Sequence, residues 1–175
     1  MITNKMKLKT FRAFTVIELL VAMGLFIILM GIAAGSFIRA MRTQRAIVAL
    51  MAANDNASLT LEQMAREIRT GSNFIKLSET ELRFDNAYTV PVVYRLEGGA
   101  VERGTTDINF ITTYKKITAD NVKVNNFVIK LFGQNPGDGY PPRITISISA
   151  TGINSFLEGV STNIQTTISA RILDS

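Results

Sequence analysis

The chain has 175 residues, enough for one ordinary domain and an additional segment. It contains neither Cys nor His, which excludes disulfides, thiolate metal sites and any catalytic triad that depends on His. Its formal net charge is +5, and a folded basic surface would indicate a nucleic-acid partner, so the position of that charge matters.

The excess positive charge lies at the beginning of the chain. Lys5, Lys7, Lys9 and Arg12 all precede Phe14, and no acidic residue does. Without these four residues the chain keeps 15 of its 19 basic residues against 14 acidic ones. From residue 71 onward the two charges are balanced. We therefore expect no nucleic-acid partner, and we also expect no catalytic residue, metal or cofactor.

Residues 19–38 contain no charged side chain. A helix over this stretch is about 30 Å long, enough to cross the hydrocarbon core of a bilayer. A buried core helix is seldom apolar on every side for so long, and the apolar region of a secretory signal peptide is shorter. The pattern predicts one membrane-spanning helix over residues 14–38, with the N-terminus in the cytoplasm because the leader holds more basic residues than the segment after the span.

Glu18 stands near the start of this apolar stretch. A carboxylate in the middle of a membrane costs about 3 kcal/mol, and less near the interface. Two interpretations are open. Either Glu18 lies at the interface and its side chain reaches water, or it has a charged partner in an assembled state.

The segment Ala13-Phe14-Thr15-Val16-Ile17-Glu18-Leu19 resembles the prepilin cleavage and methylation motif of type IV pilins and type II secretion pseudopilins. The resemblance implies that residues 1–13 are a leader peptide. It also implies that prepilin peptidase cuts between Ala13 and Phe14 and methylates the new amine of Phe14. The family usually has Gly where this chain has Ala13, and Leu where it has Val16. Ala is small enough for the same peptidase pocket, and whether it slows the cut is open.

The same resemblance gives Glu18 a role in assembly. The ammonium group at Phe14 of one subunit would pair with the carboxylate of Glu18 in its neighbour, inside an apolar filament core where an unpaired charge is costly. Repeated head to tail, such a contact forms an open filament. The implied partners are prepilin peptidase, other pilin or pseudopilin subunits, the assembly platform and the inner membrane.

Gly31 and Gly35 form a GxxxG spacing within the span. Either they allow close helix packing in the membrane or filament, or they reflect the abundance of small residues in membrane helices. Many major pilins have a Pro in this part of the helix. This chain has none there, which favours a minor pilin or a pseudopilin.

Helical periodicity continues through residues 39–70, which we expect to form an amphipathic stalk helix. An apolar stripe broken by one Asn is formed by Ile47, Leu50, Asn54, Ala57, Leu61, Met64 and Ile68. We expect this stripe to cover the sheet of the chain's own head rather than to form a coiled coil. Gly71, Ser72 and Asn73 predict the end of the helix.

Residues 71–175 have the short alternating runs of a β-rich head. The predicted strands lie at residues 74–77, 81–84, 90–96, 100–103, 108–114, 127–131, 144–148 and 164–172. A hairpin turn is predicted at Gly98 and Gly99, and looser connections at residues 134–142 and 154–163. The predicted fold class is α+β, in which a long N-terminal transmembrane and stalk helix packs on a small antiparallel sheet.

A second, looser resemblance concerns the order of elements. Residues 64–69 (Met-Ala-Arg-Glu-Ile-Arg), 94–103 and 165–171 are similar to corresponding segments of J-type minor pseudopilins and related minor pilins. Minor members of this family sit at filament tips and prime assembly, and the resemblance implies that role for this chain.

The preferred hypothesis is therefore a structural subunit, favoured as minor, of a type IV pilus, a competence pseudopilus or a type II secretion pseudopilus. It would be a single-pass protein of the bacterial inner membrane with an extracytoplasmic head. The alternative is an uncleaved, single-span anchor that presents a binding or sensor domain. An exported enzyme with a membrane anchor is disfavoured by the lack of His and Cys.

Overall fold

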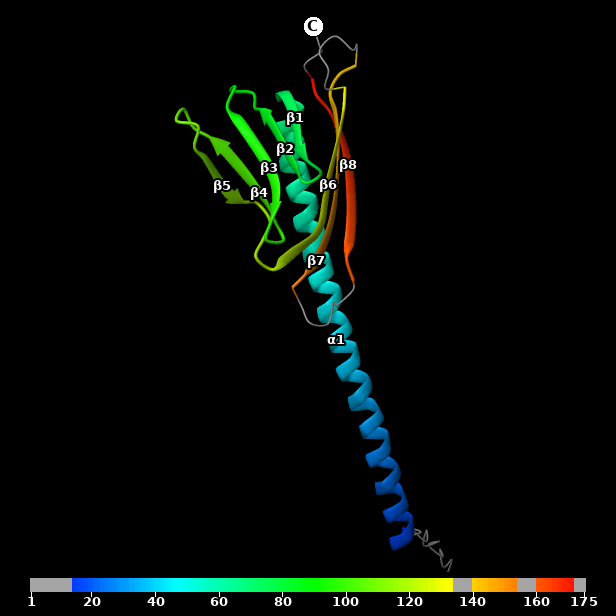
Figure 1. Cartoon of the computed structure of the whole chain (residues 1–175). Helices are drawn as coiled ribbons and strands as arrows, with labels where there is room; N and C mark the ends of the chain where they lie inside the picture. Colours follow the sequence, from blue (N-terminus) through cyan, green and yellow to red (C-terminus); the bar gives the residue numbers. More distant parts are fainter. Residues whose placement is uncertain (1–13, 134–139, 154–159, 172–175) are drawn as a thin grey trace, which may run out of the picture. The chain divides into compact units, whose positions relative to one another are not determined.

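The computed structural model describes residues 14–133, 140–153 and 160–171 (Figure 1). The predicted leader with Ala13, most of the two predicted loose connections and the last residue of the final predicted strand lie outside the described residues. The chain forms two compact units, Met1–Thr43 and Gln44–Ser175, and each is considered by itself below.

One helix runs through both units. Helix α1 covers Val16–Arg69, a length of 54 residues, and confirms the long helix predicted from the sequence to within two residues at each end. In the first unit it is the sole element among the described residues. Ser36 is the one hydroxyl residue between residues 19 and 38, and its Oγ donates to the carbonyl of Ile32 at 2.9 Å, so this hydroxyl is satisfied within the helix.

The second unit adds eight antiparallel strands to the last part of α1. Five of them form one sheet in the order β1-β2-β3-β4-β5, and three form a second sheet in the order β6-β7-β8 (Figure 1). The strands are β1 (Ser72–Ser78), β2 (Glu81–Asp85), β3 (Pro91–Glu97), β4 (Ala100–Thr106), β5 (Thr112–Lys116), β6 (Val122–Phe132), β7 (Arg143–Gly152) and β8 (Thr162–Ser169). The α+β class is confirmed, although the predicted sheet is divided into two.

The buried face of α1 differs in part from the predicted stripe. Ala57, Leu61, Met64 and Ile68 are buried as predicted, but Ile47 and Asn54 are exposed and Ala53 is buried instead. The reason is close packing at this level: a Cβ placed on Gly152 of β7 would lie 2.8 Å from the carbonyl oxygen of Ala49. Small residues face the sheet where the two backbones approach each other, and larger apolar residues face it further along.

Two asparagines of α1 bind the connections between strands. The Asn54 side-chain oxygen accepts a hydrogen bond from the Thr162 hydroxyl at 3.0 Å, at the start of β8. The Asn56 side-chain oxygen accepts the backbone N–H of Ala119 at 3.1 Å, between β5 and β6. These contacts give the polar interruptions of the helix a structural function, because each satisfies a group at the end of a sheet.

The core lies between α1 and the inner faces of both sheets. On the larger sheet the rings of Phe74, Phe84 and Tyr94 stack across β1, β2 and β3, with centroids 5.5 and 5.9 Å apart. On the smaller sheet the core is mainly aliphatic, with Ile129, Ile144, Ile146 and Ile148, and it also contains the ring of Phe127. Burial of such side chains contributes about 1.5–3 kcal/mol each, so this core stabilises the second unit.

The predicted strand at residues 108–114 is wrong in its first half. Strand β5 begins at Thr112, and residues 107–111 form the β4–β5 loop. The carboxylate of Asp107 accepts the backbone N–H groups of Asn109 and Ile111, both at 2.9 Å, and this local bonding replaces the ladder. The predicted glycine turn is present, since Gly98 and Gly99 both have positive φ and join β3 to β4.

The close approach of β7 to α1 predicts that Gly152 is needed for stability. In Gly152→Ala the new methyl group would meet the helix backbone at Ala49, so we expect the free energy of unfolding to fall by about 1–3 kcal/mol. Urea denaturation of the detergent-solubilised chain measures this. Gly24→Ala is the matched control, because no atom lies within 4 Å of a Cβ there. An unchanged midpoint for Gly152→Ala would show that the helix and sheet do not pack this closely.

Candidate functional site

The start of α1 holds the residues that the sequence marks for assembly. Phe14 precedes the helix and its side chain is 81% exposed. Thr15 caps the helix: its hydroxyl oxygen accepts the backbone N–H of Glu18 at 3.3 Å, and its carbonyl accepts the N–H of Leu19 at 3.1 Å. Glu18 therefore lies in the first turn, where the positive end of the helix dipole favours a carboxylate.

Thr15 and Glu18 also form a pattern that our sequence interpretation missed. Ser or Thr followed three residues later by Glu is the capping-box signature at a helix N-terminus, and the hydroxyl half of that motif is formed here. The signal was present in the sequence. It supplies a third explanation for Glu18, in which the residue helps to begin the helix and needs no charged partner.

Of the predicted site residues, Phe14 lies two residues before the start of α1 and Glu18 lies in the first turn of the helix. Ala13 lies outside the described residues. Among the ion pairs of the described residues, none involves Glu18. Gly31 and Gly35 lie further along α1, and in the described chain no atom comes within 4 Å of a Cβ built on either. Neither glycine is explained by packing within the described chain.

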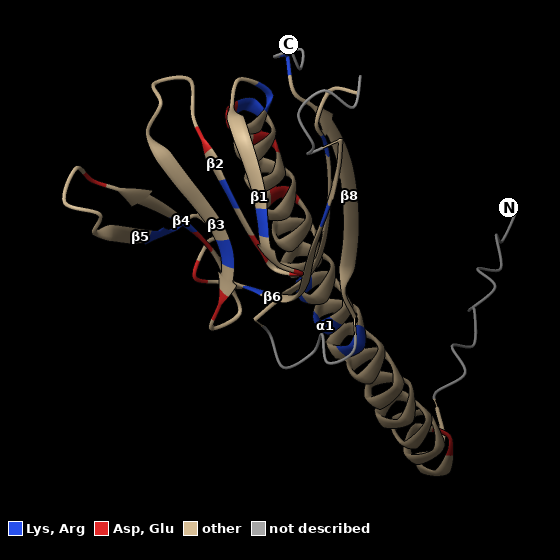
Figure 2. Ribbon diagram, turned by 45° about the horizontal axis from the view of Figure 1, so that its top comes forward, with Lys and Arg blue, Asp and Glu red and all other residues tan. Residues whose placement is uncertain are grey.

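The first part of α1 is long and apolar enough to cross a membrane. Its most apolar window has a mean hydropathy of 2.6, and none of that window is buried. Figure 2 shows no basic or acidic residue along this stretch of the helix, in agreement with the uncharged sequence of residues 19–38. The lack of any polar face means that water is a poor solvent for every side of this segment.

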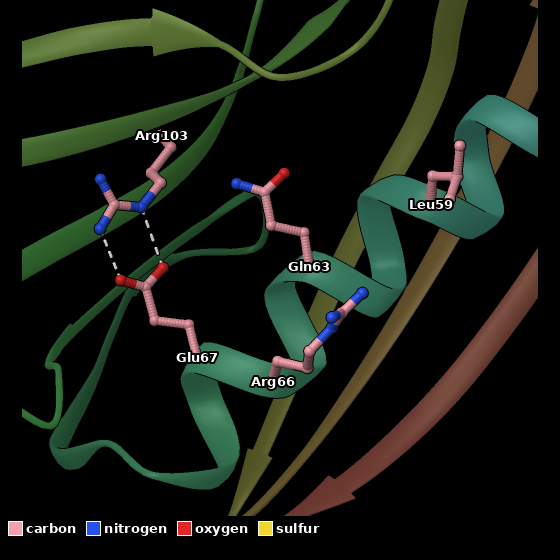
Figure 3. A pocket seen from close by; sticks show the side chains of 5 residues that line it. All are labelled: Leu59, Gln63, Arg66, Glu67 and Arg103. Atoms are coloured by element: carbon pink, nitrogen blue, oxygen red, sulfur yellow. Dashed lines mark hydrogen bonds and ion pairs between the residues drawn. The ribbon is translucent and has the colours of Figure 1, made fainter.

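A second candidate site lies in the other unit, in a groove of about 720 Å³ beside the last turns of α1. Leu59, Gln63, Arg66 and Glu67 line it from the helix and Arg103 lines it from β4 (Figure 3). Arg103 binds Glu67 through two parallel hydrogen bonds, from Nε at 2.9 Å and from Nη2 at 2.5 Å. The hydroxyl of Tyr94 on β3 donates to the same carboxylate at 2.6 Å.

This cluster changes the protonation equilibria of its members. Burial alone would raise the pKa of Glu67, but hydrogen bonds from Arg103 and Tyr94 outweigh it and hold the pKa below its ordinary value of 4.5. Burial, together with the bond to Glu67, raises the pKa of Tyr94 far above its ordinary value. All three groups therefore keep one protonation state near neutral pH, which favours a structural link between helix and sheet over proton transfer.

The groove itself has few groups free for a ligand. The guanidinium of Arg66 pairs with Glu62 at 2.9 Å, and that of Arg103 is held by Glu67. The sequence segments that carry the second resemblance contain Glu67, Tyr94 and Arg103, but the sequence does not predict that these three side chains meet. Tyr94 and Arg103 lie 27 and 36 positions after Glu67, and such separations leave no periodic pattern.

Comparisons with family models, with curated proteins and with solved structures found no match to this chain. The described residues define an α+β protein with one helix able to span a membrane.

The Glu67 cluster predicts a stability that depends on pH. Because the folded pKa of Glu67 is lowered, its contribution is complete above the unfolded pKa and is lost as the pH falls through the folded value. Glu67→Gln should cost about 3 kcal/mol near neutral pH and should reduce the loss of stability on acidification. Urea unfolding at neutral and acidic pH measures both effects. Glu62→Gln, an exposed carboxylate on the same helix, should change neither, and an equal effect of the two substitutions would contradict the assignment.

Proposed function

We propose that this chain is a structural subunit, minor rather than major, of a type IV pilus or of a competence or type II secretion pseudopilus. The observation that carries the proposal is a single 54-residue helix whose first part is apolar on every side and whose last part is covered by antiparallel sheets. A helix with that division suits two environments: lipid before assembly, and neighbouring helices after it.

The physical basis of assembly is the exchange of lipid for protein around residues 19–38. Both surroundings are apolar, so the exchange gains little from the hydrophobic effect, and close packing and polar contacts must drive it. Gly31 and Gly35 are two positions without side chains on one helix face, where a second helix can come close. Such a contact would repeat from subunit to subunit in a filament.

Charge pairing would set the register of that filament. Cleavage between Ala13 and Phe14 by prepilin peptidase would leave an ammonium group one turn from Glu18. In an apolar core, the ammonium of one subunit and the Glu18 carboxylate of the next would stabilise each other, and leaving either unpaired would be costly. The leader, the inner membrane and the assembly platform are the other components that this mechanism requires.

A second candidate function is favoured by the capped start of α1. If Thr15 and Glu18 serve only to begin the helix, the chain needs no processing and no partner for Glu18. It would then be an uncleaved single-span anchor that presents the head as a binding or sensor domain. The two functions make different predictions. A filament subunit loses residues 1–13 and needs a charged partner for Glu18, whereas an uncleaved anchor keeps these residues and needs no such partner.

The first prediction is removal of the leader. Intact-mass spectrometry of the chain from its native membrane should find a species that begins at methylated Phe14 when prepilin peptidase is active. Cells without the peptidase should contain the full chain from Met1, which serves as the control. A chain that keeps residues 1–13 in the presence of active peptidase would support the uncleaved anchor and remove the main basis of the filament mechanism.

The second prediction separates capping from charge pairing at Glu18. Gln also serves at this position of a capping box but carries no charge, so Glu18→Gln keeps the cap and removes the ion pair. We expect Glu18→Gln and Glu18→Ala to insert into the membrane normally, and both to lose filament incorporation by about tenfold or more. The measurement is the amount of chain in sheared filaments relative to membrane. Normal incorporation of Glu18→Gln with loss only in Glu18→Ala would assign Glu18 to capping.

A further inference from the structure

Two loops of the larger sheet hold apolar side chains out in water. Tyr88 in the β2–β3 loop (residues 86–90) is 85% exposed, and in the β4–β5 loop (residues 107–111) Ile108 is 94% and Phe110 91% exposed. Both loops lie at the end of the sheet where β1 begins, because they close neighbouring hairpins of one antiparallel order (Figure 1). Single exposed apolar residues are common on proteins, but several at one end of a sheet indicate a contact surface.

The two loops have the same local structure. Each begins with an Asn or Asp, and one side-chain oxygen of that residue accepts the N–H groups of the third and fifth loop residues, at 2.9–3.1 Å. The N–H groups of the first and fourth residues donate to carbonyls of the same loop, also at 2.9–3.1 Å. Four of the five backbone N–H groups of each loop are therefore bonded internally, so the loops can leave water at little cost to their backbone.

The fourth residue of each loop has a backbone conformation that its side chain disfavours. Thr89 has a φ of 58° and Phe110 a φ of 61°, both in the left-handed region. Hairpin loops of this kind usually have Gly there, and a β-branched or bulky residue at positive φ is an outlier. Because the side chain of Phe110 is exposed, packing within the described chain does not account for it. Such an outlier indicates that the ring serves a contact outside the chain.

Charge limits the surfaces that these loops can meet. Residues 85–91 and 105–112 contain two acidic residues, Asp85 and Asp107, and no Lys or Arg. The backbone N–H of Ile111 holds the pKa of Asp107 below its ordinary value, so this side chain is a carboxylate near neutral pH. An anionic surface would repel the loops. The outermost group of a zwitterionic lipid such as phosphatidylcholine is a cation, which suits both carboxylates and aromatic rings.

A lipid surface suits the loops better than a protein pocket does. A specific protein interface has about ten hydrogen bonds, whereas most backbone donors of these loops are already bonded internally. A bilayer surface needs no directional partner, and it favours tyrosine at the level of the head groups. The carboxylate of Asp107 limits the contact to that level, because a charge deeper in the bilayer is costly.

We propose that the tips of the β2–β3 and β4–β5 loops bind a zwitterionic lipid surface, with Tyr88, Ile108 and Phe110 inserted among its head groups. The apolar side chains give the affinity. The internal hydrogen bonds hold the loops in shape before contact, so that little ordering is needed on binding. This surface does not depend on the leader, on Phe14 or on Glu18. It therefore goes beyond the proposed function and stands or falls separately from it.

Tryptophan fluorescence tests the proposal, because the chain contains no Trp. Phe110→Trp places a single reporter in the full-length chain, which is reconstituted in phosphatidylcholine vesicles. Phosphatidylcholine with brominated acyl chains quenches a Trp that enters its bilayer. It is placed in the vesicles that hold the chain in one arm and in added vesicles in the other. We expect quenching and a blue shift of the emission in at least one arm.

The matched control is Ile75→Trp, at an exposed residue of β1 in the same sheet, which should stay unquenched in both arms. Absence of quenching of Phe110→Trp in both arms, or equal quenching at the two positions, would overturn the proposal. Brominated phosphatidylglycerol, which is anionic, should quench Phe110→Trp less, and stronger quenching by it would contradict the charge argument. A blue shift that grows only as the chain is concentrated would assign the loops to a second copy instead.

A further variant separates binding from folding. With Tyr88→Trp as the reporter, Phe110→Gly removes both the ring and the disfavoured φ. The urea midpoint of the detergent-solubilised chain should rise, because Gly adopts a positive φ freely. Partition of the reporter into lipid should fall by about tenfold. Ile108→Ser should reduce the partition similarly and leave the midpoint unchanged. A lower midpoint for Phe110→Gly with undiminished partition would show that the ring serves the fold, which would overturn its part in lipid binding.

Discussion

A helix that is apolar on every side has no face for water, and the rest of this molecule is arranged around that constraint. Residues 19–38 of α1 have no charged side chain, and their one hydroxyl is bonded to the backbone. Lipid or other helices suit this segment better than water does. Charged groups therefore occur only at its limits, with Glu18 in the first turn of the helix and Arg39 as the first basic residue after it.

The same helix solves the opposite problem in its last part. There one face of the helix must be buried and the other exposed to water. The sequence accordingly changes from uniformly apolar to an apolar stripe with helical spacing. Packing against the smaller sheet begins with small residues, because Gly152 approaches the backbone of Ala49, and continues with larger ones such as Met64 and Ile68. Three polar residues on this part of the helix, Asn54, Asn56 and Glu67, each bind a group of a strand or connection.

This division explains what the sequence predicts well. Uniform apolarity and the repeat of Ala57, Leu61, Met64 and Ile68 depend on neighbours along the chain, so helix α1 and the buried face of its last three turns follow from them. The loop at Asp107 and the pairing of Glu67 with Arg103 depend on side-chain hydrogen bonds, and the latter joins distant segments. Alternation also marks strands without assigning them to sheets, so the division into two sheets was not predicted. At the candidate site, the cap at Thr15 involves residues three positions apart and could be predicted from the sequence. A charged partner for Glu18 would belong to another molecule, so this chain's sequence cannot show it.

Capping and charge pairing at Glu18 are compatible in physical terms. The cap uses the backbone N–H of Glu18 and the hydroxyl of Thr15, and it fixes where the helix begins. A carboxylate in the first turn gains about 0.3–1 kcal/mol from the helix dipole at an exposed site, well below the several kcal/mol that an apolar environment costs a charge. Capping can therefore favour Glu18 at a membrane interface, but it does not offset the cost of placing a charge in an apolar core. If the chain enters such a core, as the proposed function requires, Glu18 needs a cation, and an ammonium at Phe14 is the nearest one that processing would create.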